Sequence, residues 1–427
     1  MTTTRVTIAL ACLTAVLATN VAAGTVADAA PADRATVVGA ADRDARDAPQ
    51  ARRDRFRPRQ GVSFNHPGDQ EINSKVLRAI DHTPHRGKIR AMTWNFNSWV
   101  FVNHLRAAHR RGASVRIIMG RALANEQGPG GPFNVLRRAL AAGNKHREPQ
   151  YRSWFRTCSN SCRGAGGAMH SKLYLFSKVG TAEQVVMSSS ANMTGSAATN
   201  QWNDMYTITD RKRPYKTSIK VFNEAGWDRL APYRGYIDRN IRGWFHPNRG
   251  RPDIPYQMLN RVRCRGAKGA GINGRTSIRI AQDVFNGGRG AKIARRVKEL
   301  HRRGCNVRLV YSQLVGQSRW ILRGVPRNHL VRDRDGDGAY DIYLHMKAMA
   351  ISGHYGNDRG ARIVFNGSAN WSGTGLISDE NGLVIRRDWV ERQYARQINR
   401  LFGTHLRSAP LTVARSQIGD PYRNMEQ

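Results

Sequence analysis

The sequence has few acidic residues, few cysteines and only one long apolar run. Against 31 Asp and Glu stand 69 Lys and Arg, which gives a formal net charge of +38 over 427 residues. This balance predicts attraction to polyanions such as nucleic acid, anionic lipid surfaces or anionic cell wall. Charge spread over a surface also confers solubility, so net charge alone does not identify a substrate.

The apolar run covers residues 6–23, directly after Arg5, and small residues follow at 27–29. This order is typical of a secretory signal peptide, which we expect over residues 1–29 in place of a retained membrane anchor. No later segment is apolar enough to span a bilayer. We therefore expect the mature protein to be soluble, secreted and extracellular.

Cysteine is scarce, and Cys12 falls within the expected signal peptide. The four that remain in an exported protein predict two disulfides. Of the three pairings we favour the local one, Cys158 with Cys162 and Cys264 with Cys305. A zinc site needs two closely spaced cysteine pairs and only one is present, so we expect no metal at these cysteines.

A disordered leader is predicted for residues 30–60, which are rich in Ala, Arg, Asp and Pro and have almost no aromatic residues. Such a composition cannot bury enough apolar surface to fold. Folded patterning begins near Gly61, and residues 70–81 repeat their apolar side chains at helical spacing.

An internal repeat organises the rest of the chain. His109-Arg-Arg-Gly112 matches His301-Arg-Arg-Gly304, a displacement of 301 minus 109, or 192 residues, which indicates gene duplication. Each copy lies in a predicted strand, helix and strand: residues 89–94, 99–111 and 114–119 in the first half, and 277–280, 291–303 and 305–311 in the second.

Strand, helix and strand in succession predict right-handed crossovers between parallel strands. We therefore expect an α/β fold, a duplicated α/β sandwich in which two pseudo-symmetric lobes with mixed, largely parallel sheets form one active site between them. The predicted boundaries are 61–225 for the N-terminal lobe, 226–270 for a linker region, 271–408 for the C-terminal lobe and 409–427 for a tail.

Two His-x-Lys motifs occur, one in each half: His170-Ser-Lys172 and His345-Met-Lys347. Both lie in apolar stretches that predict strands, where side chains at i and i+2 share a face. A turn of small residues follows each motif, at 188–192 and 366–370, and its hydroxyl, amide and backbone N–H groups suit an anion. A single His-x-Lys motif is usually an ordinary pair of strand residues. Two copies, each followed by a similar turn of small residues, favour a functional site.

With these parts the sequence resembles the phospholipase D superfamily, whose signature is H-x-K-x4-D followed by G-S-x-N, usually twice per chain. The resemblance spans roughly residues 61–400. Ser177 and Ser352 stand at the positions of the signature Asp, and the first G-S-x-N reads Ser-Ser-Ala-Asn at 189–192. The resemblance implies phosphodiester chemistry that needs no divalent ion and no cofactor.

In this chemistry one neutral imidazole attacks phosphorus while a second, protonated imidazole donates to the leaving oxygen. By resemblance we assign His170 as the nucleophile and His345 as the general acid, which later activates water. The phosphoryl oxygens need fixed donors. These are expected from Lys172, Lys347, Asn192 and Asn370, with support from Ser190 and Ser368.

Two carboxylates, Asp204 and Glu380, lie 12 and 10 residues after Asn192 and Asn370. Family members carry a carboxylate in this region that orients a catalytic histidine, which fixes the tautomer and favours the imidazolium. We assign that role to both residues over the alternative of ordinary surface charge.

An acidic run, formed by Asp333, Asp335, Asp337 and Asp341, resembles the first half of a calcium loop. It lacks a Glu at the closing position. An Asp/Gly turn is therefore the interpretation that we favour over a structural calcium site.

The resulting hypothesis is a secreted, monomeric phospholipase D that hydrolyses phosphatidylcholine-like head groups at a membrane surface through a phosphohistidine, with transfer to other alcohols. It rests on the resemblance of a secreted, two-lobed single chain to bacterial phospholipases D. A secreted, metal-independent nuclease is the alternative that the basic charge supports. A catalytically impaired polyanion-binding protein is a third, which the intact His and Lys residues disfavour.

Overall fold

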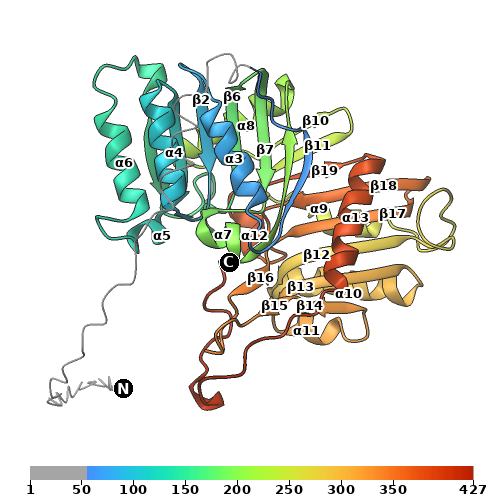
Figure 1. The fold of residues 1–427 in the computed structure, drawn as a ribbon. Coiled ribbons are helices and arrows are strands. Elements are labelled where there is room, and N and C mark those ends of the chain that lie inside the picture. The colour runs from blue at the N-terminus through green and yellow to red at the C-terminus, as the bar shows by residue number, and fades with distance from the viewer. Residues whose placement is uncertain (1–54, 427) are drawn as a thin grey trace, which may run out of the picture. The chain divides into compact units, whose positions relative to one another are not determined.

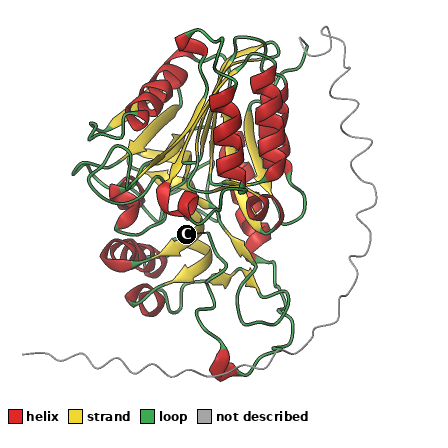
Figure 2. Cartoon of the chain, turned by 90° about the vertical axis from the view of Figure 1, so that its left-hand side faces the viewer, coloured by secondary structure: helices red, strands yellow, loops and turns green. Residues whose placement is uncertain are grey.

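Two large β-sheets with helices on their outer faces, and one small two-stranded sheet, build residues 55–426, the part of the chain described by the computed structural model (Figure 1). The predicted signal peptide and most of the predicted leader lie outside the described residues. None of the described helices is both long and apolar enough to cross a membrane. Figure 2 shows the strands inside and the helices around them.

The first sheet has the strand order β15-β16-β9-β7-β6-β2-β4-β5, with β1 also paired to β9. The first half of the chain supplies β1 (Gly61–Asn65), α3 (Glu71–Asp81), β2 (Lys88–Met92), β3 (Phe96–Asn97), α4 (Trp99–Arg110), β4 (Ser114–Gly120), α5 (Arg121–Asn125), α6 (Pro132–Ala142), β5 (Trp154–Cys158), β6 (Leu173–Val179), β7 (Ala182–Ser189), β8 (Met193–Thr194), α7 (Gly195–Thr199), β9 (Gln201–Ile208) and α8 (Lys212–Gly226).

The second sheet has the order β10-β11-β19-β18-β17-β12-β13-β14. The second half supplies β10 (Arg234–Asp238), β11 (Ile241–His246), α9 (Ile254–Asn260), β12 (Ser277–Phe285), α10 (Gly287–Arg302), β13 (Asn306–Leu314), α11 (Gln317–Ile321), β14 (Arg327–His329), β15 (Val331–Arg332), β16 (Ile342–Leu344), β17 (Lys347–Tyr355), β18 (Asp358–Gly367), α12 (Thr374–Ile377), β19 (Glu380–Ile385) and α13 (Asp388–Phe402). Two of these strands, β15 and β16, belong to the first sheet, so the halves interlock.

The same pairing scheme recurs in both sheets, which confirms the predicted duplication. The first sheet pairs β4-β2-β6-β7-β9, and the second pairs β13-β12-β17-β18-β19. In each, a helix crossover links the parallel pair, through α4 between β2 and β4 and through α10 between β12 and β13.

The sheets are mixed as expected, but the prediction that they are largely parallel is wrong. In the two large sheets five strand pairs are parallel and ten are antiparallel. The reason is local, because short turns join β6 to β7 and β17 to β18, and a short turn can connect only antiparallel strands.

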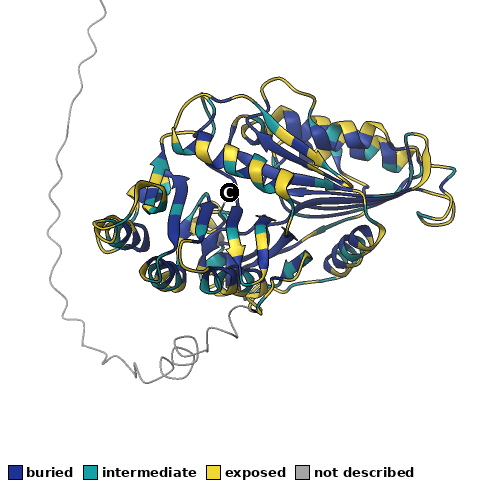
Figure 3. Ribbon diagram, turned by 90° about the horizontal axis from the view of Figure 1, so that it is seen from above, coloured by how far each residue is buried: buried dark blue, intermediate teal, exposed yellow. Residues whose placement is uncertain are grey.

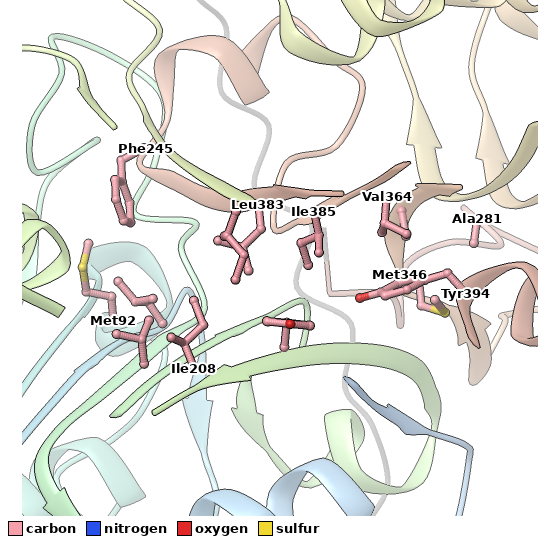
Figure 4. Packing of buried hydrophobic residues seen from close by; sticks show 14 of the residues in the cluster. Met92, Ile208, Phe245, Ala281, Met346, Val364, Leu383, Ile385 and Tyr394 are labelled. Carbon is pink, nitrogen blue, oxygen red and sulfur yellow. The ribbon is translucent and has the colours of Figure 1, made fainter. Parts of the chain in front are cut away.

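One apolar core joins the two sheets. Met92 and Ile208 of the first sheet share a cluster with Leu383 and Ile385 of the second (Figure 4). Helices α8 and α13 contribute buried residues to the same cluster. Figure 3 shows that the outer helices carry both buried and exposed residues along their length. The two lobes are therefore held against each other by buried apolar surface, which stabilises any site between them.

Three segments outside the predicted lobes are part of the fold. Residues 226–270, expected as a linker region, contribute β10 and β11, which extend the second sheet beyond β19. The end of the predicted leader is ordered, because Phe56 stacks on His82 with ring centroids 4.0 Å apart and Pro58 is buried. The tail packs on the loop at 333–341, where Ala409 N donates to Asp333 O at 3.0 Å.

Both predicted disulfides, Cys158–Cys162 and Cys264–Cys305, are present. They close loops of very different length, with sequence separations of 4 and 41 residues. Loop-closure entropy in the unfolded chain grows with that length, so the second bridge restricts the unfolded state more.

We expect the double variant C264S/C305S to lower the free energy of unfolding by about 4 kcal/mol in urea denaturation, because its disulfide closes the longer loop. The matched variant C158S/C162S should lose about 2 kcal/mol. A larger loss for the short loop would contradict the entropic account.

Candidate functional site

The two His-x-Lys motifs lie where the lobes meet, and each histidine is fixed by the backbone of the other lobe. His170 N donates to Asp379 O at 3.0 Å, just before β19, and His345 N donates to Trp202 O at 2.9 Å in β9. Lys172 directly precedes the central strand β6, and Lys347 is the first residue of the central strand β17. All four motif side chains are buried.

Each imidazole also receives its side-chain partner from the opposite half. His170 Nδ1 lies 2.9 Å from Glu380 Oε1, and His345 Nδ1 lies 2.9 Å from Asn203 Oδ1. The Nε2 atoms of both histidines are buried without a hydrogen-bond partner. When Nδ1 carries the proton and donates it to the oxygen, Nε2 presents a lone pair to the site.

The assignment of Asp204 as a histidine partner is wrong, and Asn203 takes that place. Successive residues of a strand point to opposite faces, so a shift of one position along β9 replaces the carboxylate with an amide. Asp204 instead accepts hydrogen bonds from Tyr394 Oη at 2.6 Å and Asn366 Nδ2 at 3.0 Å. The prediction for Glu380 agrees with the geometry.

The two serines of the turns lie behind the histidine partners. Ser190 Oγ donates to Asn203 Oδ1 at 2.8 Å, and Ser368 Oγ donates to Glu380 Oε2. These serines therefore fix the groups that orient the imidazoles, whereas we had expected them to support phosphate binding directly.

The lysines have equivalent backbone partners and different side-chain neighbours. Lys172 Nζ and Lys347 Nζ each donate to the carbonyl oxygen of their own motif's histidine at 2.7 Å. Lys347 Nζ also lies 2.9 Å from Asp283 Oδ2, whereas Lys172 Nζ lies 5.9 Å from the centroid of the Trp94 ring.

Asp283 and Trp94 hold equivalent places in the two lobes. In the first lobe Leu173, the residue after the motif lysine, pairs with Met92, which lies two positions before Trp94. In the second lobe Ala348, the residue after the motif lysine, pairs with Ala281, which lies two positions before Asp283. Sequence reasoning missed this pair. The available signal was a carboxylate near the end of β12, the strand next to the motif strand β17.

The two asparagines differ in their contacts. Asn192 Nδ2 donates to Glu426 Oε2 at 2.9 Å, and Asn192 Oδ1 accepts weakly from Asn95 N at 3.4 Å. Asn370 Oδ1 is buried without a partner. Glu426 belongs to the tail and was not expected at the site.

The serines that replace the signature Asp are remote from these groups. Ser177 Oγ accepts a hydrogen bond from Lys88 N at 2.8 Å, and Ser352 Oγ accepts one from Gly271 N at 3.0 Å. Each serine thus links a central strand, β6 for Ser177 and β17 for Ser352, to the backbone of a neighbouring segment. The departure from the signature therefore affects structural positions and leaves the reacting groups in place.

Burial dominates the electrostatics of the site. It lowers the pKa of His170 to about 4, against the opposing effect of Glu380. Burial, followed by the charges of Lys347 and Lys172, lowers the pKa of His345 as well. Burial also lowers the pKa of both lysines. The lysine and imidazole groups thus lie away from water, where a bound phosphate anion would favour their protonated forms.

The Asp333–Asp341 segment forms an Asp/Gly turn. Asp333 accepts hydrogen bonds from Gly336 N at 2.7 Å and Gly338 N at 2.9 Å, and Asp341 accepts one from Arg334 N at 2.8 Å. Carboxylate oxygens of Asp333, Asp335 and Asp341 lie within 4.8 Å of one another. Asp337 pairs with Arg423 of the tail, so this turn serves to anchor the tail.

Comparison with known proteins identifies related sequences and folds. The family described as cardiolipin synthase, PLD-like domain, matches residues 76–225 and 271–403. No curated protein matches the sequence. The structure of phosphatidylserine synthase from Haemophilus influenzae Rd KW20 is similar over 83% of this chain and 90% of its own, with a TM-score of 0.55 and 10% identity.

Polyphosphate kinase from Porphyromonas gingivalis is similar over 79% of this chain, with a TM-score of 0.51 and 13% identity. This chain spans 46% of the kinase. At these identities the likeness concerns the fold. The two segments matched by the family coincide with the two lobes, which confirms the duplicated architecture.

We expect the Glu380→Gln substitution to lower the pKa of His170 below its value of about 4, because the neighbouring carboxylate favours the imidazolium. Histidine NMR titration measures this shift. The control Asp204→Asn should leave the titration of His170 unchanged, since Asp204 bonds to Tyr394 and Asn366. Equal effects of the two variants would contradict the assigned partners.

Proposed function

Because the chain belongs to the phospholipase D superfamily, we propose that it is a secreted phosphodiesterase that hydrolyses phospholipid head groups through a phosphohistidine. The observation that carries this proposal is the pair of buried imidazoles, each with Nδ1 bonded to the other half and Nε2 free. Such a pair supplies a nucleophile and an acid at one phosphorus centre.

His170 is the proposed nucleophile. Attack forms a bond between its Nε2 and phosphorus, and since Nδ1 keeps its proton, the phosphorylated ring carries a positive charge. Glu380 Oε1, 2.9 Å from Nδ1, stabilises this charge. The amide of Asn203, which holds His345, offers no such charge.

His345 is the proposed general acid. Its Nε2 proton passes to the leaving oxygen as the phosphorus–oxygen bond breaks, and the neutral ring then takes a proton from water. That water attacks phosphorus, the bond to His170 breaks, and both histidines return to their first states. An alcohol in place of water would give a transferred phosphodiester by the same steps.

Asp283 supplies the negative charge that Asn203 lacks. Its Oδ2 lies 4.0 Å from His345 Nε2 and 2.9 Å from Lys347 Nζ. A carboxylate at this distance favours the protonated imidazole and offsets the repulsion from the lysine. We therefore assign Asp283 as the group that favours the protonated form of His345, against the burial that lowers the pKa of this histidine.

A phospholipid is the substrate that we favour. Trp99 and Val100 at the start of α4 are 52% and 54% exposed, and apolar side chains of this kind can enter a lipid interface. The net charge of +38 supports attraction to an anionic surface. That charge equally supports a nuclease, which is the second candidate. Secretion and a monomeric state complete the proposal.

The substrate test incubates the purified protein with phosphatidylcholine vesicles or with plasmid DNA, each with a chelator. Choline release with intact DNA is the expected result. Nicked DNA with intact lipid would replace the proposal by the nuclease. Inactivity toward both, over varied head groups and nucleic acids, would favour the polyanion-binding protein.

In the same assay His170→Asn should reduce turnover by at least about a thousandfold, because no nitrogen remains to accept the phosphoryl group. His405→Asn, an exposed histidine outside the site, is the matched control and should retain activity. Undiminished turnover by this variant would show that His170 is not the nucleophile.

Asp283→Asn should move the alkaline limb of the kcat profile to lower pH by about one unit, because loss of an opposite charge lowers the pKa of the acid. The limb reports the pH above which His345 loses its proton. Asp358→Asn, at an exposed position on β18, should leave it in place. A shift to higher pH would contradict the role assigned to Asp283.

A further inference from the structure

The tail at residues 409–426 reaches the site through Glu426, a contact that no motif of the sequence predicts. It runs along the turn at 333–341 and ends between the two sheets, where the label C stands in Figure 1. Tyr340 N donates to Pro421 O at 2.8 Å, and Met425 is buried in a cluster with Tyr343. The last described residue, Glu426, is thereby fixed at the site.

The Glu426 carboxylate is held by three neutral amides. Its oxygens accept hydrogen bonds from Asn192 Nδ2 at 2.9 Å, Gln201 Nε2 at 3.2 Å and Asn95 Nδ2 at 3.3 Å. Its backbone N donates to Tyr343 Oη at 2.7 Å. No cation of the described residues forms an ion pair with this carboxylate within 4.0 Å.

Asn192 is one of the donors assigned to the phosphoryl oxygens. The Glu426 carboxylate, which accepts a hydrogen bond from the Asn192 amide, therefore lies in the subsite expected to bind the phosphate anion. A carboxylate and a phosphodiester share a negative charge and the ability to accept hydrogen bonds. The charge of Glu426 also acts on Lys172, whose pKa it raises against the larger effect of burial. Glu426 therefore occupies Asn192, a donor assigned to the substrate phosphate, and its charge acts on Lys172, a second one.

We propose that residues 409–426 form an inhibitory strap in which the Glu426 carboxylate occupies the place of the substrate's phosphate until the strap is displaced. This inference rests on the phosphodiesterase function proposed above. Asn95 and Gln201 then extend the phosphate subsite beyond the signature residues, because they hold the same carboxylate as Asn192.

The attachment of the strap is suited to release. Arg423 pairs with Asp337 at 2.8 Å, but their side chains are 38% and 40% exposed, and salt screens such pairs. Asn424 Nδ2 donates to Asp341 Oδ1 at 3.1 Å, also at the surface. A phosphate anion that binds the open site shifts the population toward the open form.

The test measures binding of inorganic phosphate by calorimetry to the full chain and to Glu426→Gln. If the open form is a minority of about one in ten, removal of the competing charge should tighten phosphate binding about tenfold. The control for the change in net charge is Glu126→Gln, which neutralises an exposed carboxylate outside the site. Unchanged or weaker binding by the Glu426 variant would overturn the strap.

Hydrogen exchange gives a second readout that does not depend on the substitution. Phosphate should increase amide exchange across residues 409–426 of the unaltered chain, because the bound anion displaces the strap. Unchanged or slower exchange would overturn the proposal. Both measurements need only phosphate binding, so the strap can fail while the phosphodiesterase function stands, and substrate assays decide the latter separately.

Discussion

The site depends on an exchange of histidine partners between the two halves of the chain. Glu380 from the second half holds His170, and Asn203 from the first half holds His345. Neither half therefore contains a complete, oriented imidazole. The apolar core shared by the two sheets, together with the strands β15 and β16 that cross into the first sheet, keeps these contacts in register.

The duplication is symmetric in backbone and asymmetric in charge. A carboxylate faces one histidine and an amide faces the other, while Asp283 and Trp94 occupy equivalent positions beside the two lysines. These differences place one carboxylate near each imidazole, Glu380 at His170 Nδ1 and Asp283 near His345 Nε2. The two copies of one motif therefore give their histidines different charged neighbours, and a nucleophile and an acid need different protonation states.

Much of the fold was predictable, because the repeat and both His-x-Lys motifs lie in strands and helices with clear periodicity. The disulfides followed from the count and spacing of the cysteines. Antiparallel pairing was missed because it depends on turns rather than on the crossovers. The expected partner, Asp204, lies one position from the observed one, Asn203, because counting from Asn192 cannot fix which face of β9 a residue occupies. Glu426 was beyond reach, since only tertiary packing of the tail brings it to Asn192.

The central claim is that His170 carries the phosphoryl group while residues of both halves hold the two histidines. Rapid acid-free quenching during turnover, followed by mass spectrometry of proteolytic fragments, locates the covalent adduct most directly. The account predicts a phosphoryl adduct on His170 during turnover of the unaltered protein and no adduct in the His170→Asn variant. An adduct on His345, or none under conditions of turnover, would contradict it.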